Sequence, residues 1–396
     1  MAGPSHAHQD ALSSPPPTLR VALIIERFAP GAGGAENVAW QTARELIELG
    51  VDLHVFARTG EPIRGASLRL LPAPRFWQPV RVLTFSERTK RATRGRFDLV
   101  YSMTRTTRQD IYRAGGGSHA HFLENHSDRA GRSLQALSPR HQTLLALERA
   151  VFRDPSQWIV CNSKMVARDL RSRHGIGSSR MFVLYNGVDG RAFKPRPANR
   201  QAERNRIDPD ASAADSIWLF AGHGFQRKGL DLALHALALR PDSLARLWVA
   251  GRDSTARWRD LAARLGVASR VSFLGEREDM PELFAAADGL LLPTRYDAFA
   301  NVCLEGASAG LPIITTRNNG ASEIFPTLPQ ASLPPDDAEA IAHALDGLGD
   351  PVERTRVGEI TRAVASRHDW RSHAMSLLDL FRRRLSETGV TPRAGS

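Results

Sequence analysis

Two carboxylates, Asp297 and Glu305, flank the start of a predicted helix in the segment YDAFANVCLE. The apolar run 289–293 before it predicts a buried strand, and the helical pattern 301–309 ends at Gly310. At such a strand-to-helix crossing, the free amides of the first helical turn can donate hydrogen bonds to phosphate oxygens. A carboxylate farther into the helix can accept hydrogen bonds from ribose hydroxyls. The segment therefore has the chemistry of a nucleotide-sugar site, with Asp297 left to bind sugar hydroxyls.

A second group of chemically useful residues lies upstream, in AGHGFQRKGLDLAL. The predicted strand 218–221 runs into a glycine-bearing turn that Arg227 and Lys228 follow. Two cations beside a flexible backbone can neutralise a departing diphosphate, which is the charge that glycosyl transfer generates. An ordinary solvated pair at a helix start is the alternative, because basic residues near exposed turns are common. The carboxylate segment in the same strand-helix-strand series favours the functional interpretation.

Together these segments give the chain a family resemblance that covers most of its length, from residue 21 to about residue 385. The motifs FAPGAGGAE, YNGVD, AGHGFQRKGLD and YDAFANVCLEGASAGLPIITT resemble those of a family 4 retaining glycosyltransferase. Within that family, FQRKGLDLALHAL and DIYRAGGGSHAHF are most similar to bacterial lipopolysaccharide core glucosyltransferases that act on an inner-core heptose. The resemblance implies a GT-B fold, in which two Rossmann-like doubly wound parallel-sheet domains face each other across a cleft.

The resemblance also implies roles for individual residues. Arg227 and Lys228 would bind the donor pyrophosphate, and Glu305 would bind the ribose. Gly33 and Gly34 would face the donor from the other domain. The phosphates and the sugar would be bound by four backbone amides, those of Phe299, Ala300, Asn301 and Val302.

At two positions the chain departs from the family pattern. The family usually has glutamate where Asp297 stands, so the carboxylate here is one methylene shorter. This leaves open which sugar hydroxyl it reaches, and hence the donor sugar. Ala300 stands where glycine is frequent, although only its backbone need act.

The tract YRAGGGSHAHFLE, residues 112–124, is the second place for chemistry, because three glycines let a backbone approach substrate closely. His119 follows them and is the candidate for a catalytic role on the acceptor side. It would orient the acceptor and the donor sugar, bind a metal with His121 and His126, or serve as a non-catalytic histidine of the acceptor loop. The family reaction needs no metal. Related enzymes often carry an aspartate where Gly116 stands, so an acidic catalytic residue does not carry over.

Length and composition bound the class of protein. A chain of 396 residues with 42% hydrophobic residues is long enough for two domains, each with its own core. The two cysteines, Cys161 and Cys303, both lie in apolar segments, so we expect packing roles and no disulfide framework. No apolar run reaches the roughly 20 residues of a membrane span, and the first 18 residues lack a signal-peptide core. We therefore expect a cytoplasmic protein.

The net charge of +11 requires a partner or an explanation. Between Arg81 and Arg113 there are nine basic residues and three acids. Such a surface attracts nucleic acid or anionic lipid on charge alone. Because this stretch has few aromatic residues and no nucleic-acid-binding motif, we prefer docking on the anionic inner-membrane surface and expect no nucleic-acid partner. An arginine-rich composition set by the genome is the alternative.

Alternating apolar strands and helical patterns organise the chain. In the first half, strand 20–25, a glycine loop, helix 36–49 and strand 51–57 form a βαβ unit. The domains predicted from this pattern are an N-terminal disordered segment 1–18, an acceptor-side domain 19–195, a linker 196–216 and a nucleotide-sugar-binding domain 217–368. Residues 369–396 would form a helix that crosses back to the N-terminal domain, with a closing core helix of the second domain as the alternative.

The expected activity is metal-independent transfer of a hexose, with glucose preferred, from a UDP-sugar to the lipopolysaccharide inner core, with retention at the anomeric carbon. The protein would need no cofactor, since the nucleotide sugar is a substrate. It would be peripheral to the inner membrane. Three other classes stay open: a sugar-nucleotide epimerase, a silent sugar-nucleotide sensor and a basic nucleic-acid-binding protein. Donor conversion without acceptor, binding without turnover, and salt-sensitive DNA binding without UDP binding would distinguish them.

Overall fold

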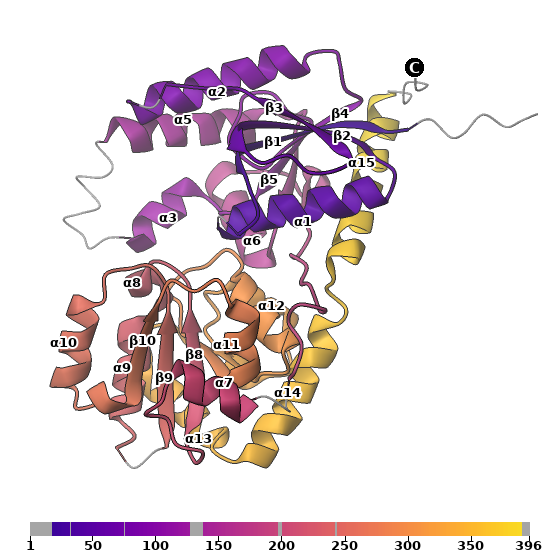
Figure 1. The fold of residues 1–396 in the computed structure, drawn as a ribbon. Helices are drawn as coiled ribbons and strands as arrows, with labels where there is room; N and C mark the ends of the chain where they lie inside the picture. The colour runs from indigo at the N-terminus through magenta and orange to yellow at the C-terminus, as the bar shows by residue number, and fades with distance from the viewer. Residues whose placement is uncertain are drawn as a thin grey trace, which may run out of the picture.

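The computed structural model describes residues 18–31, 33–74, 76–126, 138–196, 200–241 and 244–389. It shows two α/β domains, one above the other in Figure 1, each built on its own parallel sheet. Nearly all of the predicted N-terminal segment 1–18 lies outside the described residues. The two parallel sheets are those expected for the GT-B fold, and this prediction is confirmed.

The N-terminal sheet is seven-stranded, with the order β3-β2-β1-β4-β5-β6-β7. Its strands are β1 Arg20–Phe28, β2 Asp52–Gly60, β3 Ala66–Leu70, β4 Leu99–Ser102, β5 Ile111–Ala114, β6 Trp158–Cys161 and β7 Met181–Val183. Its helices are α1 Gly34–Glu48, α2 Gln78–Thr93, α3 His119–His126, α5 Pro139–Arg153 and α6 Lys164–His174. All of its strand pairs are parallel, and the strand order reverses between β1 and β4.

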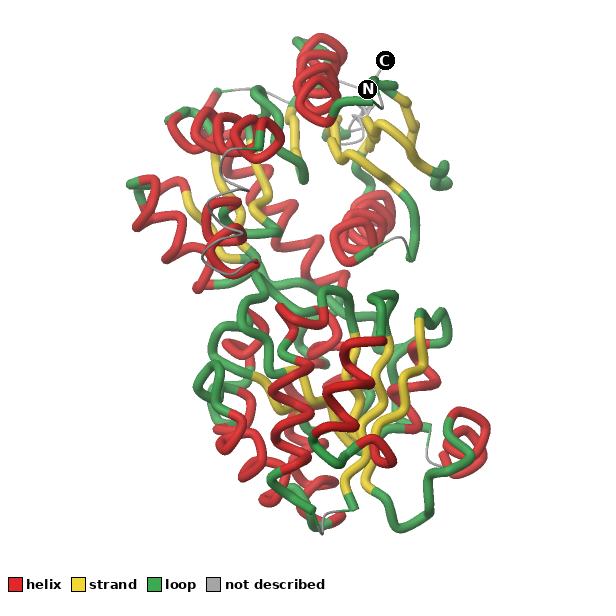
Figure 2. Tube along the Cα trace, turned by 90° about the vertical axis from the view of Figure 1, so that its left-hand side faces the viewer, coloured by secondary structure: helices red, strands yellow, loops and turns green. Residues whose placement is uncertain are grey.

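The C-terminal sheet is five-stranded, with the order β10-β9-β8-β11-β12. Its strands are β8 Ser216–Ala221, β9 Ala245–Ala250, β10 Val271–Gly275, β11 Gly289–Leu292 and β12 Ile313–Thr315. Its helices are α7 Arg200–Ile207, α8 Phe225–Lys228, α9 Leu230–Ala238, α10 Ala256–Arg264, α11 Met280–Ala286, α12 Asn301–Ser308, α13 Ala338–Gly347 and α14 Pro351–Ala365. Figure 2 shows this sheet between helices.

The central strands of the second sheet are mainly apolar because helices cover them on both faces. Trp218, Phe220 and Trp248 are fully or almost fully buried and belong to one large core. The strand order reverses between β8 and β11, so the loops after these two strands open side by side at the carboxyl edge of the sheet. This switch point is where a doubly wound sheet binds its ligand.

The predicted linker 196–216 contains helix α7, which packs on α11. Arg204 of α7 is buried and donates from Nε to the carbonyl of Ala286 at 2.8 Å. The segment from residue 200 onward is therefore attached to the C-terminal domain.

The last helix, α15 Trp370–Thr388, packs on the N-terminal domain and lies beside α1 (Figure 1). Leu377 and Phe381 belong to the core of the N-terminal sheet, and the Phe381 ring lies 5.4 Å from that of Tyr101. The chain thus passes between the domains twice, and the two passages meet at a parallel bridge between Val188 and Asp369. In the described part of the chain, no helix is long and apolar enough to cross a membrane.

Candidate active site

Glycines place the two cations beside the switch point of the C-terminal sheet. Gly222, Gly224 and Gly229 have φ angles of 135°, 77° and 79°, in the region that disfavours side chains. A Cβ atom on Gly229 would lie 2.1 Å from the carbonyl oxygen of Pro293, so only glycine lets this turn approach the end of β11. The short helix α8 is thereby held against the loop after β11, and it carries Arg227 and Lys228.

Asp297 lies between these cations. Its Oδ2 accepts from Lys228 Nζ at 2.7 Å and from Arg227 Nη1 at 3.0 Å, and Lys228 is 7% exposed. Burial alone would raise the pKa of the Asp297 carboxyl, but Lys228 and Arg227 outweigh it and lower this pKa to about 2. The carboxylate that the sequence assigns to sugar hydroxyls is therefore bonded to both predicted phosphate ligands in this structure. Its contact with sugar stays a prediction.

Glu305 lies in the second turn of α12 and is half-buried. Burial raises the pKa of its carboxyl to about 7, although the Lys228 cation acts in the opposite direction. The carboxyl group therefore changes between its protonated and ionised forms near neutral pH. Its ability to accept hydrogen bonds from ribose depends on pH in the working range of the protein.

The four amides expected to bind the donor differ in their surroundings. Phe299 N donates to Asp297 Oδ1 at 3.2 Å, and Ala300 N donates to Asn319 Oδ1 at 3.1 Å. Asn301 and Val302 begin α12, and the N-cap residue, Ala300, has no side-chain oxygen with which to cap them. The helix start itself is thus the part of this loop best suited to an anion.

The glycine loop of the N-terminal domain faces the same helix start. Gly34 is the first residue of α1, and a Cβ atom there would lie 3.8 Å from Asn301 Nδ2. A Cβ atom on Gly33 would meet Glu36 Oε2 at 2.7 Å. Gly34 of the N-terminal domain therefore lies close to Asn301 at the start of α12 in the C-terminal domain. This is the place where the sequence predicts the donor site.

A hydrogen-bond chain that the sequence did not reveal also reaches α12. Arg113 at the end of β5 is 3% exposed and donates from Nη2 to Asn186 Oδ1. Asn186 Nδ2 donates to Asn301 Oδ1 at 2.6 Å, so the chain crosses from one domain to the other. Asn186 belongs to the YNGVD motif, which is the sequence feature that could have identified it, but the motif alone does not indicate what the side chain binds.

His119 lies at the start of α3, where it is 7% exposed. Its Nε2 lies 3.0 Å from His141 Nδ1, and its backbone N donates to Glu148 Oε2 at 2.6 Å. Burial lowers the pKa of the His119 ring to about 4, and the Arg105 cation adds to the effect. The ring is therefore neutral at pH 7, and its role in catalysis stays a prediction.

His121, rather than His119, contacts the loop that carries Asp297. Its ring stacks on Tyr296 at 4.3 Å, and its Nδ1 lies 2.7 Å from Asp169 Oδ1. The side chain of His126 lies outside the described part of the structure. Among the residues that are described, no group of three or more histidine, cysteine or acidic side chains is placed to hold a metal ion.

The two domains touch beside the candidate site. Glu323 of the C-terminal domain accepts from the amides of Lys164 and Met165, at 2.7 and 2.6 Å, at the start of α6. Gly117 has a φ of 70°, and a Cβ atom there would lie 2.1 Å from the Tyr296 hydroxyl. The GGGSH loop thus lies directly against the C-terminal domain.

Comparisons with known proteins match this geometry. A family described as Glycosyltransferase Family 4 matches residues 32–191, and one described as Glycosyl transferases group 1 matches residues 215–350. The lipopolysaccharide glucosyltransferase WaaG of Escherichia coli (strain K12) is 34% identical over 190 residues, which cover 46% of this chain and 50% of that protein. A D-inositol 3-phosphate glycosyltransferase of Stackebrandtia nassauensis is 27% identical and covers 94% of both chains.

Solved structures agree on the fold. A crystal structure of WaaG superimposes with a TM-score of 0.76 at 24% identity, covering 91% of this chain and 99% of that one. Anabaena Alr3699/HepE in complex with UDP-glucose gives 0.71 at 18% identity, covering 92% and 100%. Both halves of the sequence match glycosyltransferase families, and the two sheets have the corresponding arrangement. The chain therefore belongs to the family 4 glycosyltransferases and has the GT-B fold.

Proposed function

We propose that this glycosyltransferase moves a hexose, glucose in the first instance, from a UDP-sugar to a lipopolysaccharide inner-core acceptor. One observation carries most of the proposal: Arg227 and Lys228 bind Asp297 in the loop that leads into α12 on one wall of the site, and Gly34 faces the start of α12 from the other. This arrangement suits a diphosphate bound between domains. The choice of glucose as the donor sugar and of lipopolysaccharide as the acceptor rests on the similarity to WaaG, whose name states that activity.

In the proposed reaction, the bond between the anomeric carbon and the diphosphate oxygen breaks, and the electron pair goes to that oxygen. Arg227, Lys228 and the amides of Asn301 and Val302 stabilise the negative charge that develops there. The acceptor hydroxyl attacks the anomeric carbon from the face that the diphosphate leaves, so configuration is retained. Its proton passes to the leaving phosphate oxygen. No protein nucleophile and no metal ion is required.

A panel of nucleotide sugars tests the donor, and truncated cores test the acceptor. We expect UDP-glucose to raise the unfolding temperature more than GDP- or ADP-sugars do, since only a bound ligand stabilises the native state. Turnover should then require a lipopolysaccharide core that ends at heptose. Conversion of the donor without acceptor would instead identify an epimerase. Binding with no turnover on any core would leave a sensor, and preference for inositol phosphate would move the acceptor to the class named for the other relative.

The acceptor would be a glycolipid, and we propose that the N-terminal domain docks on the anionic membrane surface that carries it. Phe76, Trp77 and Leu83 at the start of α2 are 85%, 51% and 49% exposed. Leu83 and Lys90, seven residues apart on α2, lie on one face of the helix, and Arg94 follows the helix directly, so apolar and basic groups lie on the same element. Exposed apolar side chains at one end of a helix and cations toward its other end suit an anionic lipid interface.

Replacing Phe76 and Trp77 together by serine should weaken binding to vesicles that contain phosphatidylglycerol by about tenfold or more, because two exposed rings that would insert into the lipid interface are lost. Cosedimentation measures the effect. The matched control replaces Leu239 and Leu244, which are 51% and 58% exposed on the other domain, and should bind as the unaltered protein does. Binding should also fall at high salt. Equal loss in both variants, or binding to neutral vesicles alone, would contradict this docking face.

A further inference from the structure

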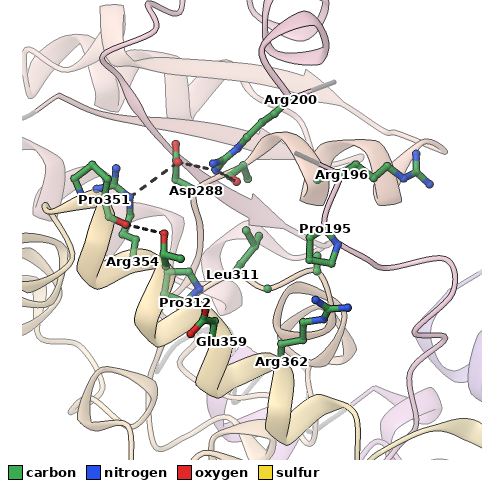
Figure 3. Close-up of a pocket in the computed structure, with 16 residues that line it drawn as sticks. Pro195, Arg196, Arg200, Asp288, Leu311, Pro312, Pro351, Arg354, Glu359 and Arg362 are labelled. Carbon is green, nitrogen blue, oxygen red and sulfur yellow. Dashed lines mark hydrogen bonds and ion pairs between the residues drawn. The ribbon is translucent and has the colours of Figure 1, made fainter. Parts of the chain in front are cut away.

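A cavity of about 320 Å³ opens in the C-terminal domain, away from the candidate active site (Figure 3). Asp288 and Pro312 line it, and they directly precede β11 and β12. The cavity is therefore at the amino edge of the sheet, whereas the candidate active site is at the carboxyl edge. Its other walls come from the passage between the domains, at Pro195, and from one face of α14.

The carboxylate of Asp288 is shared by more cations than it can neutralise. It accepts from Arg200 Nη2 at 2.6 Å, from Arg204 Nη2 at 2.5 Å and from the amide of Ile217 at 2.7 Å. Arg354 Nε lies 4.0 Å away. Asp288 is 8% exposed and Arg204 is 5% exposed, so solvent screens this cluster poorly.

The rest of the lining does not balance the charge. Arg362 adds another cation, and Figure 3 shows its guanidinium directed toward Pro195. Glu359 supplies one carboxylate. Arg196 points away from the cavity in Figure 3 and pairs with Glu282 at 2.8 Å. Three guanidiniums, those of Arg200, Arg204 and Arg354, thus surround the single carboxylate of Asp288, and the exposed Arg362 and Glu359 add one charge of each sign.

Arg200 also has hydrogen-bonding capacity left over. Its Nη2 is used by Asp288 and by the carbonyl of Ala287, whereas its Nε is buried and has no hydrogen-bond partner among the described residues. An anion in the adjacent cavity would offset the excess positive charge of these guanidiniums.

We propose that this cavity binds a small phosphate monoester, with its phosphate toward Arg200 and Arg362 and its organic part against Leu311 and Pro312. Guanidinium groups match phosphate oxygens in geometry as well as charge. The apolar wall suits a single sugar ring, and the volume is within the roughly 300–1,000 Å³ that ligand pockets occupy. Such a ligand would join Pro195, on the first passage between the domains, to α14, which leads into the second.

Binding of ribose 5-phosphate, inorganic phosphate and ribose to the full-length protein tests the site by calorimetry. We expect ribose 5-phosphate to bind, inorganic phosphate to bind more weakly, and ribose not to bind. Arg362→Glu should weaken ribose 5-phosphate binding by about tenfold or more, because it reverses a charge that faces the phosphate. Thr355→Trp should block the cavity, since Thr355 is an exposed lining residue.

Two controls separate this site from the catalytic one and from misfolding. Arg356→Glu reverses an exposed charge on the same helix outside the lining and should leave binding unchanged. Lys228→Ala should also leave it unchanged, and UDP should not displace ribose 5-phosphate. The melting temperatures of all variants show whether they fold. Equal affinity in Arg362→Glu, Thr355→Trp and the unaltered protein, displacement by UDP, or absence of binding to the unaltered protein would each overturn the proposal.

Discussion

Replacing Lys228 by alanine should lower turnover by roughly a hundred- to a thousandfold, the loss that follows removal of one donor to a developing oxyanion. Lys228 is 7% exposed and its Nζ lies 2.7 Å from Asp297 Oδ2, so little water competes for the ammonium. Arg227 still pairs with Asp297 in this variant, so the carboxylate is not left alone in the interior. Initial rates of UDP release with a saturating acceptor measure the effect.

The split between kinetic constants tests the reason for the loss. A group that acts mainly as charge develops lowers kcat more than it raises KM. Lys164→Ala, which removes an exposed ammonium from the other domain, is the control and should retain activity. An unchanged rate in Lys228→Ala with intact folding would remove Lys228 from the mechanism.

Replacing Glu305 by alanine should weaken UDP-glucose binding by about ten- to a hundredfold, because a charged acceptor of ribose hydroxyls is lost. The unaltered protein should bind UDP-glucose more tightly at pH 8 than at pH 6, because burial raises the pKa of Glu305 to about 7. Above that pH the ionised carboxylate can accept hydrogen bonds from both ribose hydroxyls, whereas the protonated acid uses one oxygen as a donor. Glu305→Gln should bind weakly and without this pH dependence. Calorimetry across the pH range measures both; intact affinity in Glu305→Ala would contradict the ribose role.

The ionisation of Glu305 should also make the free energy of unfolding depend on pH. The pKa of Glu305 is raised from 4.5 to about 7 in the native state, so the folded protein holds this proton more tightly than the unfolded chain does. The contribution of this group to stability therefore falls as pH rises from 4.5 to about 7 and is constant above that range. Glu305→Gln should remove this fall, which urea unfolding at several pH values would show.

Much of the fold could be predicted because short sequence signals mark its strands and the ends of its helices. The run 289–293 and Gly310 identify β11 and the end of α12 without knowledge of any partner. β5 was not predicted, because its four residues include Arg113, whose buried cation breaks the apolar run. Helix α2 was missed for a related reason: its dense basic residues were assigned to a surface, without the helix that presents them.

Contacts within one domain of the candidate site could be predicted from the sequence, whereas contacts between the domains could not. Arg227 and Asp297 could be placed together because they follow β8 and β11, which are neighbours at the switch point. The contacts of Asn186 with Asn301 and of His121 with Tyr296 depend on how one domain is oriented on the other. No local pattern encodes that orientation, so these contacts became visible only in the structure.

The position of α15 has a consequence for biosynthesis. Because Leu377 and Phe381 complete a core that begins at Val21, the first domain to leave the ribosome lacks one wall until the last helix has been made. Its nascent sheet must remain unaggregated while the entire second domain is synthesised. A message truncated shortly before Trp370 would therefore damage the half of the protein that was translated first.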